Sequence, residues 1–353
     1  MIDTIISEDI QEITRECDRS FFEGKKALVT GGAGFLGSYL CDTLAKLEAD
    51  VTCLDDFSTG LKTNIDHLTR VKNFRVLNSD VSKFKSKEAF DYIFNLASRA
   101  SPEDYQLHPI ETLLTNSNGS HRMLELARKG NSRIVLASTS EVYGDPKIIP
   151  TPENYWGNVN PTGIRSCYDE GKRFSEALFM AYNREYKLNM RIVRIHNTYG
   201  PRMRADGAYA RALPRFIVQA LKGDDITVYG DGLQTRSFTY VSDTIRGILS
   251  VFCSGKTKGE VLNIGNPQET AILDLAKKIR EAINDNVSIK FCPLPADDPK
   301  RRRPDIKRAE NILYWHPKVG LDQGLLRTIE WFRRQGTNLQ TTKRKKLAHK
   351  RPL

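Results

Sequence analysis

Short apolar runs alternate with longer amphipathic segments from residue 24 to residue 195. Six runs rich in strand-forming residues lie at 26–30, 51–54, 74–77, 92–96, 133–137 and 191–195. Between them, apolar residues recur with helical spacing at about 35–47, 110–129 and 168–186. Strands that alternate with helices are typical of a parallel sheet covered on both faces, so we expect an α/β protein with a doubly wound parallel sheet.

Beyond residue 200 the predicted elements are shorter and more scattered. Helices are expected near 211–222, 242–252, 271–284, 305–313 and 321–334, and strands at 226–229 and 261–264. We expect a smaller C-terminal α/β cap, with some segments returning to the sheet, over the carboxyl ends of the strands, where open α/β sheets bind ligands. The predicted divisions are a helical extension (1–22), a nucleotide-binding domain (23–200), a substrate-binding cap (201–336) and a basic tail (337–353).

Charge and composition narrow the classes of protein. The formal net charge is +11, but the segments 300–303 and 341–353 carry ten of these charges, so the rest of the chain is nearly neutral. We expect the tail to be disordered, with no specific nucleic-acid partner. No apolar stretch of membrane-spanning length and no signal peptide are recognised, and the six cysteines lack metal-site or redox spacing. These features predict a soluble protein of a reducing compartment, the cytoplasm, with no metal site and no membrane partner.

A glycine-rich turn follows the first predicted strand. Gly31 permits a tight turn, Gly34 allows a pyrophosphate to approach the backbone, and Gly37 allows close packing of helix on strand. Strand, glycine turn and helix form the context that a dinucleotide fingerprint requires, although a glycine-rich turn alone is weak evidence. The sequence therefore predicts a Rossmann-like sheet with a dinucleotide at the start of the next helix.

Acidic residues at the end of the second strand indicate which dinucleotide binds. An acid such as Asp55 hydrogen-bonds a ribose diol and repels a 2′-phosphate, which favours NAD over NADP; the alternative is that Asp55 caps a turn. Asp80 either borders the adenine or lies in a surface turn. The candidate cofactor-binding residues are Gly31, Gly34, Phe35, Leu36, Gly37, Asp55, Asp56, Asp80, Val81, Leu96, Ala97, Tyr168 and Lys172.

The pair Tyr168 and Lys172 is the main candidate for chemistry. Residues four apart in a helix share one face. An ammonium about 4 Å from a phenolate stabilises it by about 4 kcal/mol at an effective dielectric constant of about 20. That energy would bring a tyrosine pKa from about 10 toward 7, where the phenolate accepts a proton from a sugar hydroxyl. The alternative is an ordinary amphipathic pair.

Longer motifs carry a family resemblance. The glycine fingerprint, Ser138-Thr139-Ser140-Glu141, Tyr-x-x-x-Lys and residues 194–202 resemble the extended short-chain dehydrogenase/reductase superfamily of nucleotide-sugar enzymes. The strings at 136–146, 155–161, 165–173, 228–238 and 304–307 are similar to the UDP-glucuronate decarboxylase (UDP-xylose synthase) family within it. The likeness extends from about residue 25 to residue 335.

The resemblance implies a reaction and residue roles. Tyr168 would take the proton of the carbon-4 hydroxyl, Thr139 would orient that hydroxyl, and Lys172 would hold the pKa of Tyr168 low and bind the nicotinamide ribose. NAD⁺ would oxidise carbon-4 and later reduce it, so that UDP-glucuronate loses carbon dioxide through a 4-keto intermediate, gives UDP-xylose, and NAD is recycled. Ser140 and Glu141 would line the carbon-5 and carbon-6 region. A homodimer through helices near 110–129 and 168–186 is also implied.

Two further sets of residues follow from the resemblance. The implied catalytic residues are Thr139, Ser140, Glu141, Tyr168, Lys172 and Arg302, the last steering protonation of the enolate. The implied substrate-binding residues are Tyr105, Glu141, Asn197, Arg202, Tyr229, Gln234, Arg236 and Arg302. Asn197 and Arg202 are expected at the nucleotide diphosphate, whereas Arg236 is either a phosphate ligand or part of an ion pair, and Tyr229 borders the uracil or belongs to the core.

Alternatives to decarboxylation remain open. Related dehydratases carry Asp where this chain has Ser140, and a serine is a poor acid, which favours decarboxylation. Arg99, His196 and the loop 207–216 depart from the decarboxylase pattern. A nucleotide-sugar 4-epimerase or 4,6-dehydratase is therefore the alternative. A non-catalytic NAD-binding regulator is the remote one, which the intact Thr139, Tyr168 and Lys172 argue against.

Overall fold

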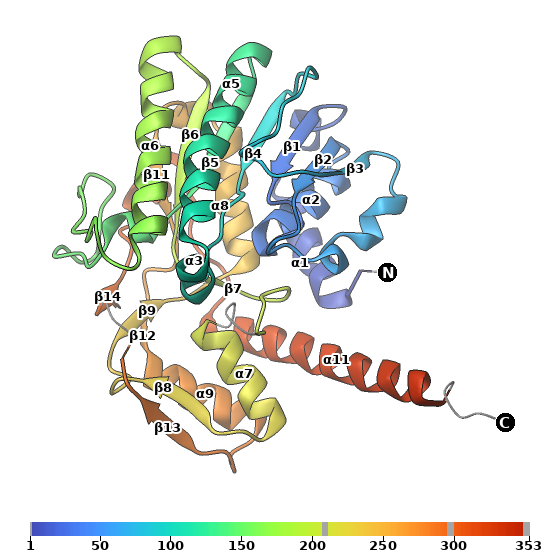
Figure 1. The fold of residues 1–353 in the computed structure, drawn as a ribbon, viewed down its shortest axis with the longest axis vertical. Helices are drawn as coiled ribbons and strands as arrows, with labels where there is room; N and C mark the ends of the chain where they lie inside the picture. Colours follow the sequence, from blue (N-terminus) through green and yellow to red (C-terminus); the bar gives the residue numbers. More distant parts are fainter. Residues whose placement is uncertain (1, 207–210, 295–299, 349–353) are drawn as a thin grey trace.

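A seven-stranded sheet forms the centre of the molecule (Figure 1). The computed structural model describes residues 2–206, 211–294 and 300–348. All paired strands of this sheet are parallel, in the order β11-β6-β5-β4-β1-β2-β3. Its strands are β1 (Lys26–Thr30), β2 (Asp50–Asp55), β3 (Phe74–Asn78), β4 (Tyr92–Asn95), β5 (Arg133–Thr139), β6 (Met190–Ile195) and β11 (Val261–Ile264). The chain reverses direction across the sheet at β1, which confirms the predicted doubly wound, Rossmann-like fold.

Alternation along the strands divides the core into two layers. Successive side chains of a strand point to opposite faces, so Leu28 and Val29 of β1 belong to different apolar clusters. The Val29 side is covered by α2 (Phe35–Lys46) and α8 (Val241–Cys253). The Leu28 side is covered by α5 (Ser120–Gly130) and α6 (Ser166–Tyr186). Burial on both faces explains why these strands are continuously apolar.

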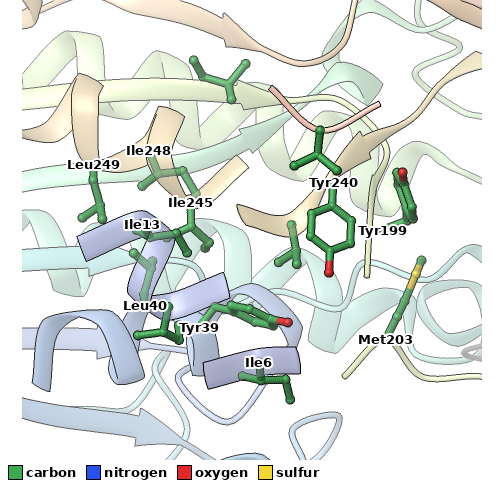
Figure 2. Packing of buried hydrophobic residues seen from close by; sticks show 14 of the residues in the cluster. Ile6, Ile13, Tyr39, Leu40, Tyr199, Met203, Tyr240, Ile245, Ile248 and Leu249 are labelled. Atoms are coloured by element: carbon green, nitrogen blue, oxygen red, sulfur yellow. The ribbon is translucent and has the colours of Figure 1, made fainter. Parts of the chain in front are cut away.

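The N-terminal extension is built into the core. Helix α1 (Thr4–Arg15) begins after Asp3, whose carboxylate accepts a hydrogen bond from the backbone N–H of Ile5 (2.9 Å). The helix packs against α2 and α8. Figure 2 shows Ile13 of α1 beside Ile245 of α8. Ile5, Ile6, Ile10 and Ile13 are all buried, so the isoleucines of α1 form one buried face.

The predicted helix at 110–129 is interrupted. It consists of α4 (Pro109–Leu114), a π-helical turn (Thr115–Gly119) and α5, and an additional helix, α3 (Pro102–Leu107), precedes it. Within the turn, Asn116 Nδ2 donates to Thr112 O (2.9 Å) and Ser117 Oγ donates to Leu113 O (2.7 Å). Such side-chain bonds to the backbone compete with regular helical bonding, and the Thr-Asn-Ser-Asn-Gly composition weakens the helix further.

The C-terminal third contributes a smaller layer, below the central sheet in Figure 1. Its strands are β8 (Ile226–Tyr229) paired with β13 (Ile289–Cys292), and β9 (Thr235–Ser237) between β12 (Glu269–Ala271) and β14 (Arg301–Arg302). Helices α7 (Ala212–Lys222) and α9 (Ile272–Ile283) pack on β8. The short strands β7 (Thr198–Tyr199) and β10 (Thr239–Tyr240) pair with each other, and α10 (Lys307–Leu313) precedes the last helix. Short 3-10 turns occupy Arg19–Phe21, Lys62–Asn64, Asp66–Arg70, Ser140–Tyr143 and Gly255–Thr257.

The last helix, α11 (Leu321–Ala348), differs from the prediction at its end. The sequence predicts a disordered tail from residue 337, whereas the backbone is helical through Ala348. Residues 337–348 contain no proline or glycine, and eight of the twelve are Lys, Arg, Leu, Gln or Ala, which favour helix. The remainder of the predicted tail, 349–353, lies outside the described residues.

None of the described helices combines the length and the apolar character needed to cross a membrane.

Candidate active site

A cavity of about 680 Å³ opens at the carboxyl ends of the central strands, between the sheet and the cap. Every residue that the sequence singles out for the cofactor, the substrate or catalysis borders it. These residues come from the segments after β1, β2, β3, β4, β5 and β6, from α3 and α6, and from the cap strands. This is where open α/β sheets bind ligands. Their individual roles stay predictions, but the structure brings the whole set together.

The glycine turn is shaped for a dinucleotide. Gly31 has a φ of +67°, and a Cβ atom there would lie 2.9 Å from the Cα atom of Ala97. A Cβ atom on Gly37 would lie 2.0 Å from the carbonyl oxygen of Gly31. Gly34 is the N-cap of α2 and supplies no side-chain cap, so the first N–H groups of α2 are free to bind an anionic group. These features fit the pyrophosphate of NAD.

The two acids at the end of β2, Asp55 and Asp56, differ in burial and in their hydrogen-bond partners. Asp55 is buried, and its carboxylate accepts hydrogen bonds from the backbone N–H groups of Ala33 (2.9 Å) and Phe57 (2.8 Å). Burial raises the pKa of Asp55, while these two bonds lower it. Asp55 thus braces the glycine turn, as the turn-capping alternative expects, besides bordering the cavity. Asp56 is exposed, borders the cavity and accepts a hydrogen bond from Ser58 N (2.9 Å).

Asp80 and Val81 also border the cavity. Asp80 accepts a hydrogen bond from Ser82 N (2.8 Å), so it forms a turn after β3. Val81 is buried, and its side chain fills the space above Gly119 of the π-helical turn. Leu96 and Ala97 close the same end of the cavity after β4.

Helix α6 presents the predicted catalytic pair to the end of β5. Tyr168 hydrogen-bonds Thr139, and Lys172 Nζ donates to the carbonyl oxygen of Ala137 (2.9 Å). Both α6 side chains are almost fully buried. Tyr168 and Lys172 therefore lie on one face of α6, as their spacing predicts.

The predicted depression of the Tyr168 pKa is wrong for this structure. Burial raises the pKa of Tyr168 to about 12, although Arg211 and the Thr139 hydrogen bond lower it. Burial also lowers the pKa of Lys172 to about 8. Lys172 Nζ lies 6.0 Å from the centroid of the Tyr168 ring and is directed to Ala137 O. The spacing of Tyr168 and Lys172 in the sequence predicts that they share one face of the helix. It does not reveal the burial that opposes the effect of the lysine charge on the pKa of Tyr168.

A cluster of charges surrounds Glu141, which follows β5. Its carboxylate is held by both nitrogen arms of Arg302 from β14 and by Arg165, which precedes α6. Although burial alone would raise it, Arg302 and Arg165 hold the pKa of Glu141 well below its usual range. Two guanidinium groups share the Glu141 carboxylate, so the cluster carries a net positive charge beside the cavity when its second acid, Asp169, is protonated.

Arg165 is a site residue that the sequence reasoning missed. It borders the cavity, and its Nε atom lies 4.0 Å from Asp169. Burial and the Glu141 charge raise the pKa of Asp169 to about 7. The signal was present, because Arg165 opens the family-like string that contains Tyr168, but its side-chain direction follows only from the tertiary structure.

Tyr105 lies against Tyr168, the predicted catalytic tyrosine. The rings of Tyr105 and Tyr168 stack with centroids 5.1 Å apart and planes 2° apart. The Tyr105 hydroxyl is buried and has no hydrogen-bond partner among the described residues. Burial and the Glu141 charge raise its pKa. An unpaired buried hydroxyl at a cavity wall is suited to a polar ligand group.

The two predicted diphosphate ligands differ. Asn197 Nδ2 is buried without a hydrogen-bond partner among the described residues, so it remains available to a ligand. Arg202 borders the cavity, but it forms a buried ion pair with Asp42 (2.6 Å) and lies over the ring of Tyr39 (5.2 Å). Arg202 is thus already paired within the protein, which the sequence does not reveal.

The cap supplies the remaining wall. Arg215 lies over the ring of Tyr229 (4.4 Å to the centroid), and Gln234 Nε2 donates to Tyr229 O (2.8 Å). Arg236 donates to the carbonyl oxygen of Thr235 (2.8 Å) and borders the cavity. These side chains form a wall rich in guanidinium groups, which suits a phosphorylated ligand. Within the described ranges there is no group of acids, histidines or cysteines arranged to hold a metal ion.

Comparisons with known proteins identify the family. The model of the NAD dependent epimerase/dehydratase family matches residues 27–265. UDP-glucuronic acid decarboxylase 1 of Danio rerio is 46% identical over 88% of this chain and 73% of its own length. UDP-glucuronic acid decarboxylase 2 of Arabidopsis thaliana is 47% identical over 89% of this chain and 69% of its own length.

A solved structure of UDP-glucuronic acid 4-epimerase from Bacillus cereus, in complex with UDP-glucuronic acid and NAD, is also similar. It has a TM-score of 0.79 and 29% identity, and the match covers 88% of this chain and 99% of that chain. The protein described here belongs to the NAD dependent epimerase/dehydratase family.

Proposed function

We propose that this protein is a carboxy-lyase that converts UDP-glucuronate to UDP-xylose and carbon dioxide through a 4-keto intermediate, with NAD recycled. The observation that carries the proposal is the position of the Glu141 cluster beside Tyr168. When Asp169, whose pKa is raised to about 7, is protonated, Arg165 and Arg302 together carry one more positive charge than Glu141 balances. That excess suits the carboxylate of a uronate next to the group that starts the oxidation. The relatives named as UDP-glucuronic acid decarboxylases support the same substrate.

The reaction begins at Tyr168 and Thr139. Thr139 orients the carbon-4 hydroxyl of the sugar, and Tyr168 accepts its proton. Gly31, Gly34 and Gly37 would hold NAD, which would supply a reversible hydride acceptor for carbon-4. Lys172 would bind the nicotinamide ribose, and its charge would oppose the burial that raises the pKa of Tyr168, which favours the phenolate needed for proton transfer. Because the resulting 4-ketone is β to the carboxylate, its carbonyl accepts the electrons released with carbon dioxide.

The residues near carbon-5 and carbon-6 favour decarboxylation over dehydration. Ser140 is buried beside the cavity, and its hydroxyl is too weak an acid to donate a proton near neutral pH. Glu141 is held ionised by its two arginines, so it is no acid for a departing hydroxyl. Arg302 remains close to the reacting carbons and steers protonation of the enolate that decarboxylation leaves.

Product analysis tests this function. The protein is incubated with UDP-glucuronate and NAD, and the nucleotide sugars are read by mass. Loss of the mass of carbon dioxide, without net conversion of NAD, is the expected result. An unchanged mass with a new sugar configuration would indicate a 4-epimerase instead, and loss of water a dehydratase. Tyr168→Phe is the control, because it retains the ring but cannot accept the proton.

We also propose a homodimer through α4 and α6. Exposed apolar side chains gather on α3, α4 and α6: Leu107, Ile110, Leu113, Leu114 and Phe174. Surfaces of this kind mark protein interfaces. Light scattering of the wild type and of Ile110→Glu tests the proposal; a monomeric wild type contradicts it. Cytoplasmic location remains part of the proposal, supported by the free cysteines, and no nucleic-acid or membrane partner is proposed.

A further inference from the structure

Three side chains of α6 face three consecutive residues of β5. Tyr168, Lys172 and Glu176 follow one another at four-residue spacing, so they lie on one face of the helix. Each of them contacts one residue of β5. Thr139 contacts Tyr168, and the carbonyl oxygen of Ala137 accepts a hydrogen bond from Lys172. The hydroxyl of Ser138 donates a hydrogen bond to Glu176. The first two contacts belong to the proposed mechanism. The third has no role in it.

Glu176 is held rigidly. Its Oε1 atom accepts hydrogen bonds from Ser138 Oγ (2.6 Å) and Arg194 Nε (2.9 Å), and its Oε2 atom accepts from Arg194 Nη2 (2.7 Å). Arg194 stands on β6 directly beside Ser138 in the sheet register. The other arm of Arg194 donates to Tyr143 OH (2.9 Å) and to the carbonyl oxygen of Glu153 (2.9 Å). Removing both charges of this bidentate ion pair from water costs free energy. A role beyond stability would explain why the pair is kept.

The neighbour that this carboxylate affects is Lys172. Lys172 is 3% exposed, and burial lowers its pKa to about 8. Any further decrease in this pKa would leave more of the side chain neutral near neutral pH. Of the charged groups packed around this part of α6, namely Tyr168 and Glu176 on the helix and Arg194 on β6, only Glu176 raises the pKa of Lys172. Without that charge, a buried lysine becomes neutral more easily.

We propose that Glu176 is a positioning residue that keeps Lys172 protonated and directed at Ala137 O, through a carboxylate fixed by Arg194 and Ser138. The proposal deepens the proposed function and rests on it for the role of Lys172. Lys172 serves the reaction only as a cation, because it stabilises a phenolate and donates to ribose hydroxyls. Glu176 does not border the cavity, so it acts through Lys172 and not on the substrate.

Titration of Lys172 tests the proposal without any turnover. The ¹⁵N shift of the Lys172 ammonium is followed against pH in protein labelled at lysine Nζ, and Lys172→Arg assigns the signal. Glu176→Gln should lower the midpoint by about one pH unit, a tenfold loss of proton affinity. The matched control is Glu153→Gln, which removes a carboxylate charge from the same buried region but keeps an oxygen that accepts from the backbone N–H of Asn263 (2.8 Å). An unchanged midpoint in Glu176→Gln overturns the proposal.

A second variant guards against misfolding. Glu176→Gln leaves the cation of Arg194 unpaired, so Glu176→Gln with Arg194→Met removes both charges and should show a midpoint lowered in the same direction.

Measurements of turnover then distinguish a positioning role of Glu176 from a purely structural one. Activity of the Glu176 variants relative to wild type should fall as pH rises, whereas a structural defect would reduce it equally at every pH. If the midpoint moves but wild-type protein does not decarboxylate UDP-glucuronate, the proposed function fails and the link from Glu176 to Lys172 stands.

Discussion

Two largely shielded carboxylates in this protein have similar neighbours and opposite pKa shifts. Glu141, at the cavity, and Asp9, on the inner face of α1, are both near tyrosines and arginines. Arg302 and Arg165 hold the pKa of Glu141 well below its usual range despite its burial. Burial raises the pKa of Asp9 to about 7, and Arg327 opposes it only in part.

The surroundings of Asp9 explain the contrast. Its Oδ2 atom accepts hydrogen bonds from Tyr240 OH (3.0 Å) and Tyr39 OH (3.1 Å). A single guanidinium, Arg327, lies 2.9 Å from Oδ1. Asp9 therefore joins α1 to α2, to the short strand β10 and to α11 as a structural connection. One cation does not offset the loss of water around a carboxylate that is 0% exposed.

The number of guanidinium groups around each carboxylate explains why one site can bind a ligand and the other only supports the fold. At Glu141 the arginines outnumber the acid and leave charge for a ligand when Asp169 is protonated, whereas at Asp9 no charge is left over. The predictions below follow from this difference, from the largest expected effect to the smallest.

Removing Arg302 should affect chemistry most. Arg302→Met leaves Glu141 with one arginine and removes the group proposed to steer protonation of the enolate, so turnover of UDP-glucuronate should fall about a hundredfold or more. Arg327→Met, which removes the corresponding arginine from Asp9, is the matched control and should leave turnover close to wild type. Initial rates at saturating substrate measure both. Equal losses in the two variants would contradict the comparison.

Neutralising Asp9 should change stability in a pH-dependent way. Because the folded pKa of about 7 lies above the ordinary value of 3.8, folding takes up a proton between these values, and wild-type stability falls as pH rises from about 4 to 7. Asp9→Asn lacks this loss. The variant should match wild type near pH 4 and exceed it by up to roughly 4 kcal/mol at pH 8.

Urea unfolding of wild type and Asp9→Asn at both pH values measures this difference. Glu12→Gln, one turn away on α1, is the control; because Glu12 is the smallest contributor to the raised pKa of Asp9, this variant should keep most of the wild-type pH dependence. A constant difference between Asp9→Asn and wild type across the pH range would show that Asp9 does not carry the raised pKa.

Arg165 should contribute to binding of the negatively charged carboxylate of the sugar. Arg165→Gln removes the excess cation, so the dissociation constant for UDP-glucuronate should rise about tenfold. The constant for UDP-xylose, which lacks the carboxylate, should stay near wild type. Calorimetry with NAD present measures both ligands. An equal loss for the two would place Arg165 outside carboxylate binding.

The acids after β2 should separate cofactor binding from folding. Asp55→Ala removes two backbone contacts, so it should weaken NAD binding and lower the melting temperature. Asp56→Ala should weaken NAD binding modestly and leave the melting temperature unchanged, because Asp56 is exposed. NAD titration and thermal unfolding measure the two effects. Unaltered preference for NAD over NADP in Asp55→Ala would contradict the ribose assignment.

Much of this protein was predictable because its signals are local. The apolar runs give the strands of the central sheet, and the glycines mark a turn whose crowding the structure explains through Gly31 and Gly37. The motifs around Thr139 and Tyr168 place the cavity correctly. Each depends on spacing along the chain, which sequence states directly.

The parts that escaped prediction depend on tertiary contacts. Arg165 meets Glu141, and Arg194 meets Glu176, only because separate elements are brought together. The raised pKa of Tyr168 reflects burial, which spacing does not reveal. The role of α1 was likewise unclear until Asp9 was seen between three other elements of the fold.

The central claim is that Tyr168 starts a reversible oxidation at carbon-4 and that the arginine cluster directs loss of the neighbouring carboxylate. UDP-glucuronate carrying deuterium at carbon-4 tests it most directly, with the product read by mass and NMR. The account predicts UDP-xylose that has lost carbon dioxide and still carries the deuterium on carbon-4. A product that retains the carboxylate, or UDP-xylose without the label, would contradict it.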